Sequence, residues 1–211
     1  MILYLIRHAE SAYNAEGRIQ GQSDPPLSAL GHRQSQLLAA ARGELPVEAV
    51  YSSPLARAMD TARPLAEALK LEIRARPELM ELNAGIFQGR SWSELADVFP
   101  AEAACWASQD PDFRIPGGES RRELMVRGRA ALEAIRVGGE RQVAVVSHGG
   151  ILAAALKSLL RIPAERNPFT FFNASINKLA WDDDRVKLLS LNQVDHLRRP
   201  DGELETKSGD L

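Results

Sequence analysis

Ile2-Leu3-Tyr4-Leu5-Ile6 is a continuous apolar run that stops at Arg7-His8. Such a run, without alternating polar residues, is typical of a strand whose two faces are both covered, as in parallel sheets. The N-terminus lacks the basic region of a signal peptide, so we expect this run to form a buried strand. The strand then places Arg7 and His8 at the edge of a sheet, where ligands usually bind.

Strands and helices alternate along most of the sequence. Beyond the first strand, the pattern predicts strands at Val47–Tyr51, Leu71–Ala75 and Gln142–Ser147. It predicts helices at 28–43, 55–69, 119–135 and 151–160. Near the C-terminus it predicts a hairpin of 175–181 with 186–191 around Asp182-Asp183-Asp184. This order favours an α/β fold with a mainly parallel sheet covered on both faces. Aromatic residues mixed with Pro and Gly between Trp92 and Ser120 indicate an inserted lid segment.

The composition is that of a soluble globular protein, with 45% hydrophobic and 26% charged residues. The length of 211 residues predicts one large domain, or one domain with an insertion. With 26 basic and 28 acidic residues the formal net charge is -2, so we expect no nucleic-acid partner. No apolar run approaches the ~20 residues that cross a bilayer, so we expect no membrane partner either. The single Cys105 excludes cysteine-rich zinc sites and fits a reducing cytoplasm.

Polar side chains follow several of the predicted strands. Arg7 and His8 follow the first, Arg57 comes soon after the second, and His148 follows a later one. Because ligands bind beyond the carboxyl ends of such strands, we expect these side chains to meet. Guanidinium groups match the geometry of a phosphate and stay charged, and a neutral imidazole among them could attack phosphorus.

The leaving oxygen of a phosphate ester needs a proton, which predicts a carboxyl group near the same site. Glu78 and Glu81 are both candidates, and position alone does not separate them. Taken singly, each of these residues has an ordinary structural explanation, because a lone Arg at a strand end is more often an ion-pair partner than a catalyst. Their convergence at one edge of the sheet is what indicates a function.

Other phosphate chemistries leave signatures that this sequence lacks. There is no Gly-x-x-x-x-Gly-Lys-Ser/Thr run of a P-loop and no Gly-x-Ser-x-Gly elbow. Cys105 is not followed by the Gly-rich loop and Arg that a cysteine phosphatase needs. The four histidines are widely spread and offer little to a two-metal hydrolase. A histidine site without metal or cofactor remains.

An ordered set of motifs supports this interpretation. It consists of Leu5-Ile6-Arg7-His8-Ala9-Glu10-Ser11, Asn14, Gly17-Arg18-Ile19-Gln20-Gly21, the segments 26–31, 52–58 and 81–85 with Gln88-Gly89, and the segments 116–120, 146–150, 173–176 and 191–192. The set resembles the histidine phosphatase superfamily, the phosphoglycerate mutase-like proteins, over roughly residues 1–197. It therefore predicts a single domain over 1–197 with the lid at about 92–120, and a polar, frayed tail at 198–211.

The resemblance implies a three-layer α/β/α sandwich, a phosphohistidine intermediate and no metal or cofactor. In this family pattern His8 matches the nucleophile and Glu81 the proton donor. The phosphate- and substrate-binding positions match Arg7, Asn14, Gln20, Gly21, Arg57, His148 and Gly149. The function implied is metal-independent hydrolysis of a small phosphomonoester.

Two alternatives are a cofactor-dependent phosphoglycerate mutase and a non-catalytic sensor of phosphorylated ligands. Mutases of the family are typically longer, whereas here the insertion is short and the tail Pro200–Leu211 is polar, which favours the phosphatase branch. We expect the lid to determine which substrate binds, through the side chains of Trp92, Phe99, Trp106, Phe113 and Arg114. These residue types would suit several kinds of phosphorylated metabolite equally well. The segment Phe169–Phe172 either packs in the core, which we favour, or forms the edge of a homodimer.

Overall fold

The computed structural model describes residues 1–183, 185–199 and 201–206. Within these residues, one six-stranded sheet runs in the order β3-β2-β4-β1-β5-β6. The strands are β1 (Ile2–Arg7), β2 (Ala49–Ser52), β3 (Ile73–Ala75), β4 (Gln142–Ser147), β5 (Ile176–Asp182) and β6 (Arg185–Gln193). β3, β2, β4 and β1 pair in parallel, whereas β5 pairs antiparallel with both β1 and β6. The sheet is therefore mixed and mainly parallel.

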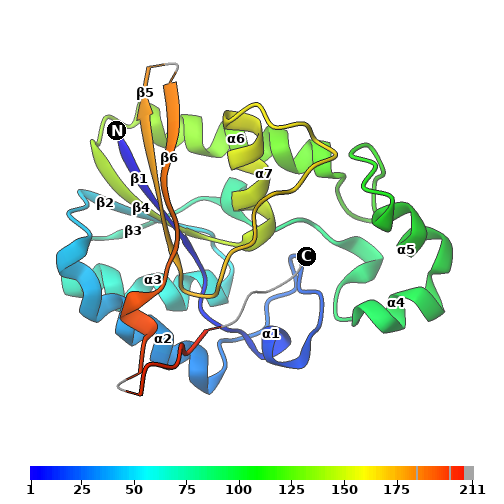
Figure 1. Ribbon diagram of the computed structural model, residues 1–211, viewed down its shortest axis with the longest axis horizontal. Coiled ribbons are helices and arrows are strands. Elements are labelled where there is room, and N and C mark those ends of the chain that lie inside the picture. The colour runs from blue at the N-terminus through cyan, green and yellow to red at the C-terminus, as the bar shows by residue number, and fades with distance from the viewer. Residues whose placement is uncertain (184, 200, 207–211) are drawn as a thin grey trace.

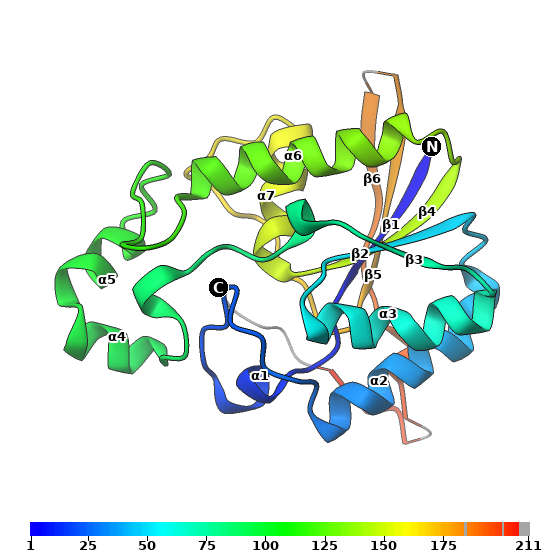
Figure 2. The same ribbon diagram turned by 180° about the vertical axis from the view of Figure 1, so that it is seen from behind.

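Helices cover both faces of this sheet (Figures 1 and 2). α2 (Ala29–Ala40) and α3 (Ala56–Leu69) lie on one face, and α6 (Arg121–Val137) and α7 (Gly149–Leu159) lie on the other. The short helices α1 (Ala12–Glu16), α4 (Trp92–Val98) and α5 (Pro100–Ala107) stand outside these layers. The predicted three-layer α/β/α sandwich is confirmed. No helix in the described ranges is both long and apolar enough to span a bilayer.

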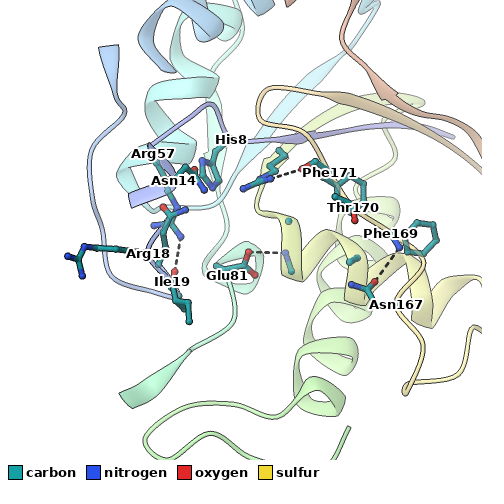
Figure 3. A pocket seen from close by; sticks show the side chains of 16 residues that line it. His8, Asn14, Arg18, Ile19, Arg57, Glu81, Asn167, Phe169, Thr170 and Phe171 are labelled. Atoms are coloured by element: carbon teal, nitrogen blue, oxygen red, sulfur yellow. Dashed lines mark hydrogen bonds between the residues drawn. The ribbon is translucent and has the colours of Figure 1, made fainter. Parts of the chain in front are cut away.

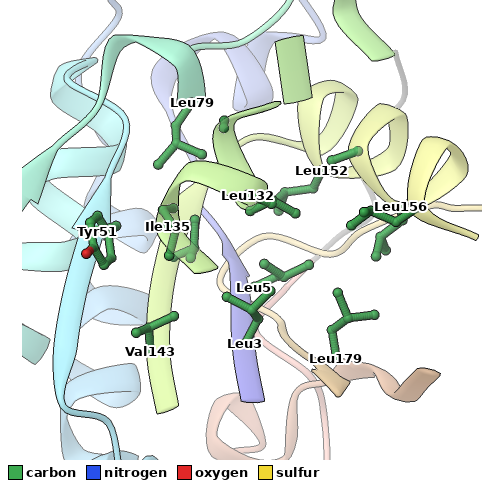
Figure 4. Close-up of a cluster of buried hydrophobic side chains, with 14 of the residues drawn as sticks. Leu3, Leu5, Tyr51, Leu79, Leu132, Ile135, Val143, Leu152, Leu156 and Leu179 are labelled. Atoms are coloured by element: carbon green, nitrogen blue, oxygen red, sulfur yellow. The ribbon is translucent and has the colours of Figure 1, made fainter. Parts of the chain in front are cut away.

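Alternation of side chains along β1 explains its continuous apolar run. Leu3 and Leu5 pack with Leu132 in the cluster formed against α6 and α7 (Figure 4). Tyr4 and Ile6 belong to a second cluster, formed against α2 and α3. Because successive residues of a strand point to opposite faces, a strand between two helical layers must be apolar at every position.

Most predicted elements are present, with shifted ends. β4 has the predicted bounds, whereas β2 and β3 each begin two residues later than predicted. The helix predicted at 28–43 ends at Ala40 and continues as a 3-10 turn over Ala41–Glu44. Pro64 lies inside α3 without ending it. Of the turn predicted at Asp182-Asp183-Asp184, residue 184 lies outside the described residues.

The inserted segment between Trp92 and Ser120 contains α4 and α5, which project from one end of the sandwich (Figures 1 and 2). A third apolar cluster joins them to the rest of the protein, with Leu95 and Trp106 packed among residues such as Phe87. The rings of Phe87 and Trp106 meet edge to face with 6.3 Å between centroids. Helices α4 and α5 therefore have their own apolar contacts, separate from the two faces of the sheet.

The described part of the C-terminal tail is bonded to the body of the protein. Thr206 Oγ1 donates to Asn173 O at 2.8 Å, and Glu205 N donates to Leu197 O at 3.0 Å. The Glu205 carboxylate also pairs with Arg33 of α2. The prediction of a frayed tail is wrong for residues 201–206, because these bonds hold them. Residues 200 and 207–211 lie outside the described residues.

Candidate active site

A cavity of about 80 Å³, called here the main pocket, is lined by residues that follow β1 and β4 (Figure 3). Eight of the nine residues that the sequence assigns to the site line it: Arg7, His8, Asn14, Gln20, Gly21, Arg57, Glu81 and Gly149. The ninth, His148, lies next to His8 with 5.1 Å between their ring centroids. The fold thus brings together residues that are far apart in the sequence.

His8 is almost fully buried, and its hydrogen bond fixes the protonation of its ring. Nδ1 lies 2.7 Å from Ala9 O, and since a carbonyl oxygen only accepts, Nδ1 carries the hydrogen. Burial, with the positive charges of Arg57 and Arg7, holds the pKa of His8 well below its usual value. The ring is therefore neutral at pH 7 and keeps a lone pair on Nε2. His8 has the form of a nucleophile.

His148 is a second fully buried and neutral imidazole. Its Nε2 lies 2.8 Å from Ser53 Oγ, and its Nδ1 has no hydrogen-bond partner in the described part of the chain. Burial, followed by the charges of Arg57 and of His8, lowers the pKa of His148 well below its usual value. Ser53 is thus the group that orients His148. Ser53 directly follows β2 and belongs to the motif segment 52–58.

Two buried guanidinium groups, those of Arg7 and Arg57, bring positive charge to the main pocket, which the partly exposed Arg18 also lines. Arg7 Nη1 donates to Phe171 O at 2.5 Å. Arg57 donates from Nη1 to Ser23 O and from Nη2 to Gly21 O, both at 2.7 Å. Burial lowers the pKa of Arg57 to about 10, which still leaves it charged at neutral pH. Arg57 Nε is buried without a partner among the residues described, so this N–H is left for a bound anion.

The loop that follows α1 forms one wall of the main pocket. Gly21 has a φ of +54°, and a Cβ added there would lie 2.5 Å from Gln88 Oε1, so glycine is required at this position. Ser11 Oγ lies 2.7 Å from Gln20 Oε1 and 3.1 Å from Asn14 Oδ1. One hydroxyl therefore positions the two amide side chains that the sequence assigns to phosphate binding.

Glu81 lies in the main pocket at the N-terminus of α7. Its Oε1 accepts from Leu82 N at 2.8 Å and from Ile151 N at 2.9 Å. Its Oε2 accepts from Gly150 N at 2.9 Å (Figure 3). These bonds satisfy two backbone N–H groups in the first turn of α7 and fix the position of the carboxyl group. Glu78 is exposed and does not line the pocket, so the geometry favours Glu81 as the acid.

The structure adds lining residues that the sequence did not assign. These are Arg18, Ile19, Gly150 and Ala153, with Asn167, Phe169, Thr170 and Phe171 of the loop before β5. Phe169 and Phe171 are buried, and their rings stack with 6.3 Å between centroids. Core packing is therefore confirmed for Phe169 and Phe171, whereas Thr170 is exposed and Phe172 is half-buried. The apolar character of this loop does not show whether its residues lie in the core or in a pocket wall. Its position just before the Asn173 motif was the one feature of the sequence that could have indicated a place near the site.

The charge of the main pocket suits an oxyanion. Arg7 and Arg57 attract negative charge, whereas Gly150 N and Ile151 N at the start of α7 already donate to Glu81. Within the described residues, no group of three or more His, Cys, Asp or Glu side chains is placed to hold a metal ion. The arrangement can therefore bind a phosphate, offer it a neutral imidazole and exchange a proton through Glu81.

The lowered pKa values of His8 and His148 predict that stability falls on acidification. Below about pH 6.5 the unfolded histidines bind protons that the folded ones do not, so the free energy of unfolding decreases as the pH falls. Each histidine contributes at most about 1.4 kcal/mol per pH unit. Urea unfolding between pH 7.5 and 5.5 measures this slope. We compare the free energies of unfolding of His148→Gln and the wild type, each relative to its own value at pH 8. The variant should lose about half of the pH dependence, and an unchanged dependence would contradict the lowered pKa of His148.

Comparison with known proteins finds similar phosphatases and probable mutases. A metal-independent phosphoserine phosphatase of Arabidopsis thaliana is 40% identical over 201 residues, which cover 92% of this chain and 82% of that protein. A probable phosphoglycerate mutase of Enterobacter sp. (strain 638) is 36% identical over 184 residues, which cover 86% of this chain and 85% of that protein. Among solved structures, a mycobacterial glucosyl-3-phosphoglycerate phosphatase is similar with a TM-score of 0.79 and 31% identity, over 90% of this chain and 98% of that one.

The family to which these relatives point is also matched directly. The model of the histidine phosphatase superfamily (branch 1) matches residues 3–194, which extend from β1 to the residue after β6. The matched stretch includes the buried His8, the two guanidinium groups and Glu81. The chain therefore belongs to branch 1 of the histidine phosphatase superfamily.

Proposed function

We propose that this protein hydrolyses phosphomonoesters of small metabolites without a metal ion, through a phosphohistidine on His8. The observation that supports this most is the state of His8, whose Nδ1 donates to Ala9 O and whose pKa is lowered. Both features leave Nε2 with a lone pair at neutral pH. The ring lines a pocket that also contains Arg7 and Arg57, so an attacking nitrogen and the charges that bind phosphate share one small space.

In the first step Nε2 of His8 forms a bond to phosphorus while the ester P–O bond breaks. Glu81 gives its proton to the leaving oxygen, which departs as an alcohol. Arg7 and Arg57 stabilise the negative charge spread over the other phosphoryl oxygens. In the second step Glu81 takes a proton from water, the resulting oxygen attacks phosphorus and the N–P bond breaks. Inorganic phosphate leaves and His8 returns to its neutral form.

Phosphoglycerate mutase is the second candidate, because several relatives at 36% and 38% identity are named as probable phosphoglycerate mutases. A mutase must pass the phosphoryl group to a second substrate hydroxyl and keep water away from it. The phosphoserine phosphatase at 40% identity and the phosphatase of known structure favour hydrolysis. A sensor without catalysis is disfavoured by the neutral, fixed imidazole of His8, which ligand binding alone does not need.

Phosphorus NMR distinguishes these functions. The purified protein, in excess chelator, is given 3-phosphoglycerate and a panel of sugar and aryl phosphates. We expect inorganic phosphate to appear and no isomerised phosphoglycerate. A 2-phosphoglycerate signal that grows faster than free phosphate would establish the mutase instead. A phosphoenzyme formed with any substrate would exclude the alternative of a non-catalytic sensor.

The remaining features of the proposal concern the whole molecule. We propose one domain over residues 1–197, in which the lid at about 92–120 helps to select the substrate, followed by the tail. The cytoplasm is the proposed compartment, since Cys105 is an exposed free thiol that a reducing environment preserves. A homodimer stays a prediction for sedimentation velocity to decide.

A further inference from the structure

A second cavity of about 380 Å³ adjoins the main pocket, and it is called here the side pocket. It lies among α5, α6 and α7, and the ribbon shows α6 and α7 side by side with α5 beyond the N-terminal end of α6 (Figures 1 and 2). Gly150, Ala153 and Asn167 line both cavities. A molecule bound in the main pocket can therefore extend into the side pocket.

One stripe of α7 forms the floor that connects the two cavities. Gly150, Ala153, Ala154 and Lys157 line the side pocket, and their spacing of three, four and seven residues puts them on a single helix face. The first three have small side chains, which leaves room above the helix. At 1.5 Å of rise per residue, Lys157 lies roughly 10 Å along the axis from Gly150.

Arg121 of α6 contributes a fixed charge to the side pocket. Its guanidinium carbon lies 3.4 Å from the centroid of the Trp106 ring, and Nη2 donates to Trp106 O at 2.9 Å. These two contacts hold the group in place. Nη1 is buried and has no hydrogen-bond partner among the described residues. A positioned charge with an unsatisfied donor is a site for an acceptor, preferably a negatively charged one.

Lys157 contributes a second charge at the far end of the stripe. Its side chain is buried, with only 5% of its surface exposed, and Nζ donates to Ala164 O at 2.6 Å. An ammonium group has three donors, so this bond leaves two unused. Burial, and next the nearby charge of Arg121, lower the pKa of Lys157. A bound anion would relieve both effects, because it pairs with the two charges at once.

The negative groups near these two cations do not neutralise them. Glu165 and Asp110 are exposed, and neither forms an ion pair with Arg121 or Lys157 within the described ranges. Apolar side chains of Leu82, Trp106, Leu124 and Met125 line the side pocket, together with the exposed carboxylate of Glu165. The side pocket therefore combines an apolar wall with two cations, Arg121 and Lys157, against one exposed carboxylate.

We propose that the side pocket binds the leaving-group part of the substrate, and that this part carries a second anionic group about 10 Å from the phosphate, held by Arg121 and Lys157. This inference rests on the proposed phosphatase function and narrows its substrate class. Phosphoserine and 3-phosphoglycerate separate carboxylate and phosphate by only a few bonds. Neither molecule reaches from the main pocket to Lys157, so a longer, bifunctional phosphomonoester fits better.

A series of phosphorylated ω-hydroxy acids, with chains of three to eight carbons, tests this proposal. Each acid is compared with the alkyl phosphate of equal length that ends in a methyl group, and the ratio of the two kcat/KM values is the measured quantity. We expect the ratio to peak near six carbons at about tenfold or more. Lys157→Gln and Arg121→Gln each lower the peak ratio severalfold. A ratio of two substrates is insensitive to the fraction of each variant that folds.

Arg122→Gln is the matched control, because Arg122 neighbours Arg121 but pairs with Asp112 on the surface. We expect this variant to keep the wild-type ratio. Phenyl phosphate separates the two proposals, since it has no second anion. If phenyl phosphate is hydrolysed but the ratio is flat with chain length, or is equal in the Lys157 and Arg121 variants and the wild type, the side-pocket proposal is wrong. If no phosphate is released from any ester, the phosphatase function itself fails.

Discussion

His8→Ala is expected to lower turnover of every phosphomonoester by at least about 10⁴-fold and to abolish the phosphoenzyme. The reason is that His8 supplies the only nitrogen in the main pocket that is both neutral and held with its lone pair on Nε2 among the residues described. Steady-state phosphate release and acid-quenched trapping of labelled enzyme measure the two effects.

His32→Ala is the control for this prediction, because His32 is an exposed histidine on α2. Its turnover should match that of the wild type. The side chain of His8 also packs against His148, so a loss of activity alone could reflect a collapsed site. Phosphate binding by the His8→Ala protein answers this, since Arg7 and Arg57 remain in place. Normal turnover in His8→Ala would overturn the phosphohistidine mechanism.

The layers of the fold follow from local sequence patterns. Apolar residues at every position of β1 require cover on both faces, and Leu3 and Tyr4 indeed pack into different clusters. The ends of elements were less predictable, because distant residues set them. α7 begins at Gly149, two residues before the predicted start, and Glu81 accepts from the N–H groups of its first turn. That carboxylate is far from α7 in sequence.

The candidate site was predictable where its residues belong to compact motifs. Arg7 and His8 directly follow a recognisable strand, and Arg57 follows the next one in the sequence. Asn167 and Phe171 were missed, because they belong to a loop without a motif and reach the pocket only through the fold. The side pocket was missed for a similar reason. In the sequence, Lys157 is a single charged residue in an apolar helix. Only the fold shows that it lines a cavity together with Trp106 and residues of α6.

Glu81→Gln is expected to slow alkyl phosphates by about 10²- to 10³-fold and aryl phosphates by less than about tenfold. An alkoxide is a poor leaving group and needs the proton of Glu81 as the P–O bond breaks, whereas a phenolate such as nitrophenolate leaves without it. Glutamine keeps the size of the side chain but has no proton to give. Phosphate release from ethyl and nitrophenyl phosphate, measured in the variant and the wild type, gives the two factors.

The contacts of Glu81 make this comparison of leaving groups necessary. The carboxylate accepts from Gly150 N and Ile151 N at the start of α7, and an amide cannot accept both bonds equally well. A shift of α7 would disturb Gly149 in the main pocket and slow both ester classes alike, which would argue against an acid role. Glu78→Gln is the matched control, since Glu78 is exposed and three residues away, and we expect wild-type rates for both esters. Selective slowing of the alkyl ester would therefore be evidence that Glu81 donates a proton, and not the result of a shift of α7.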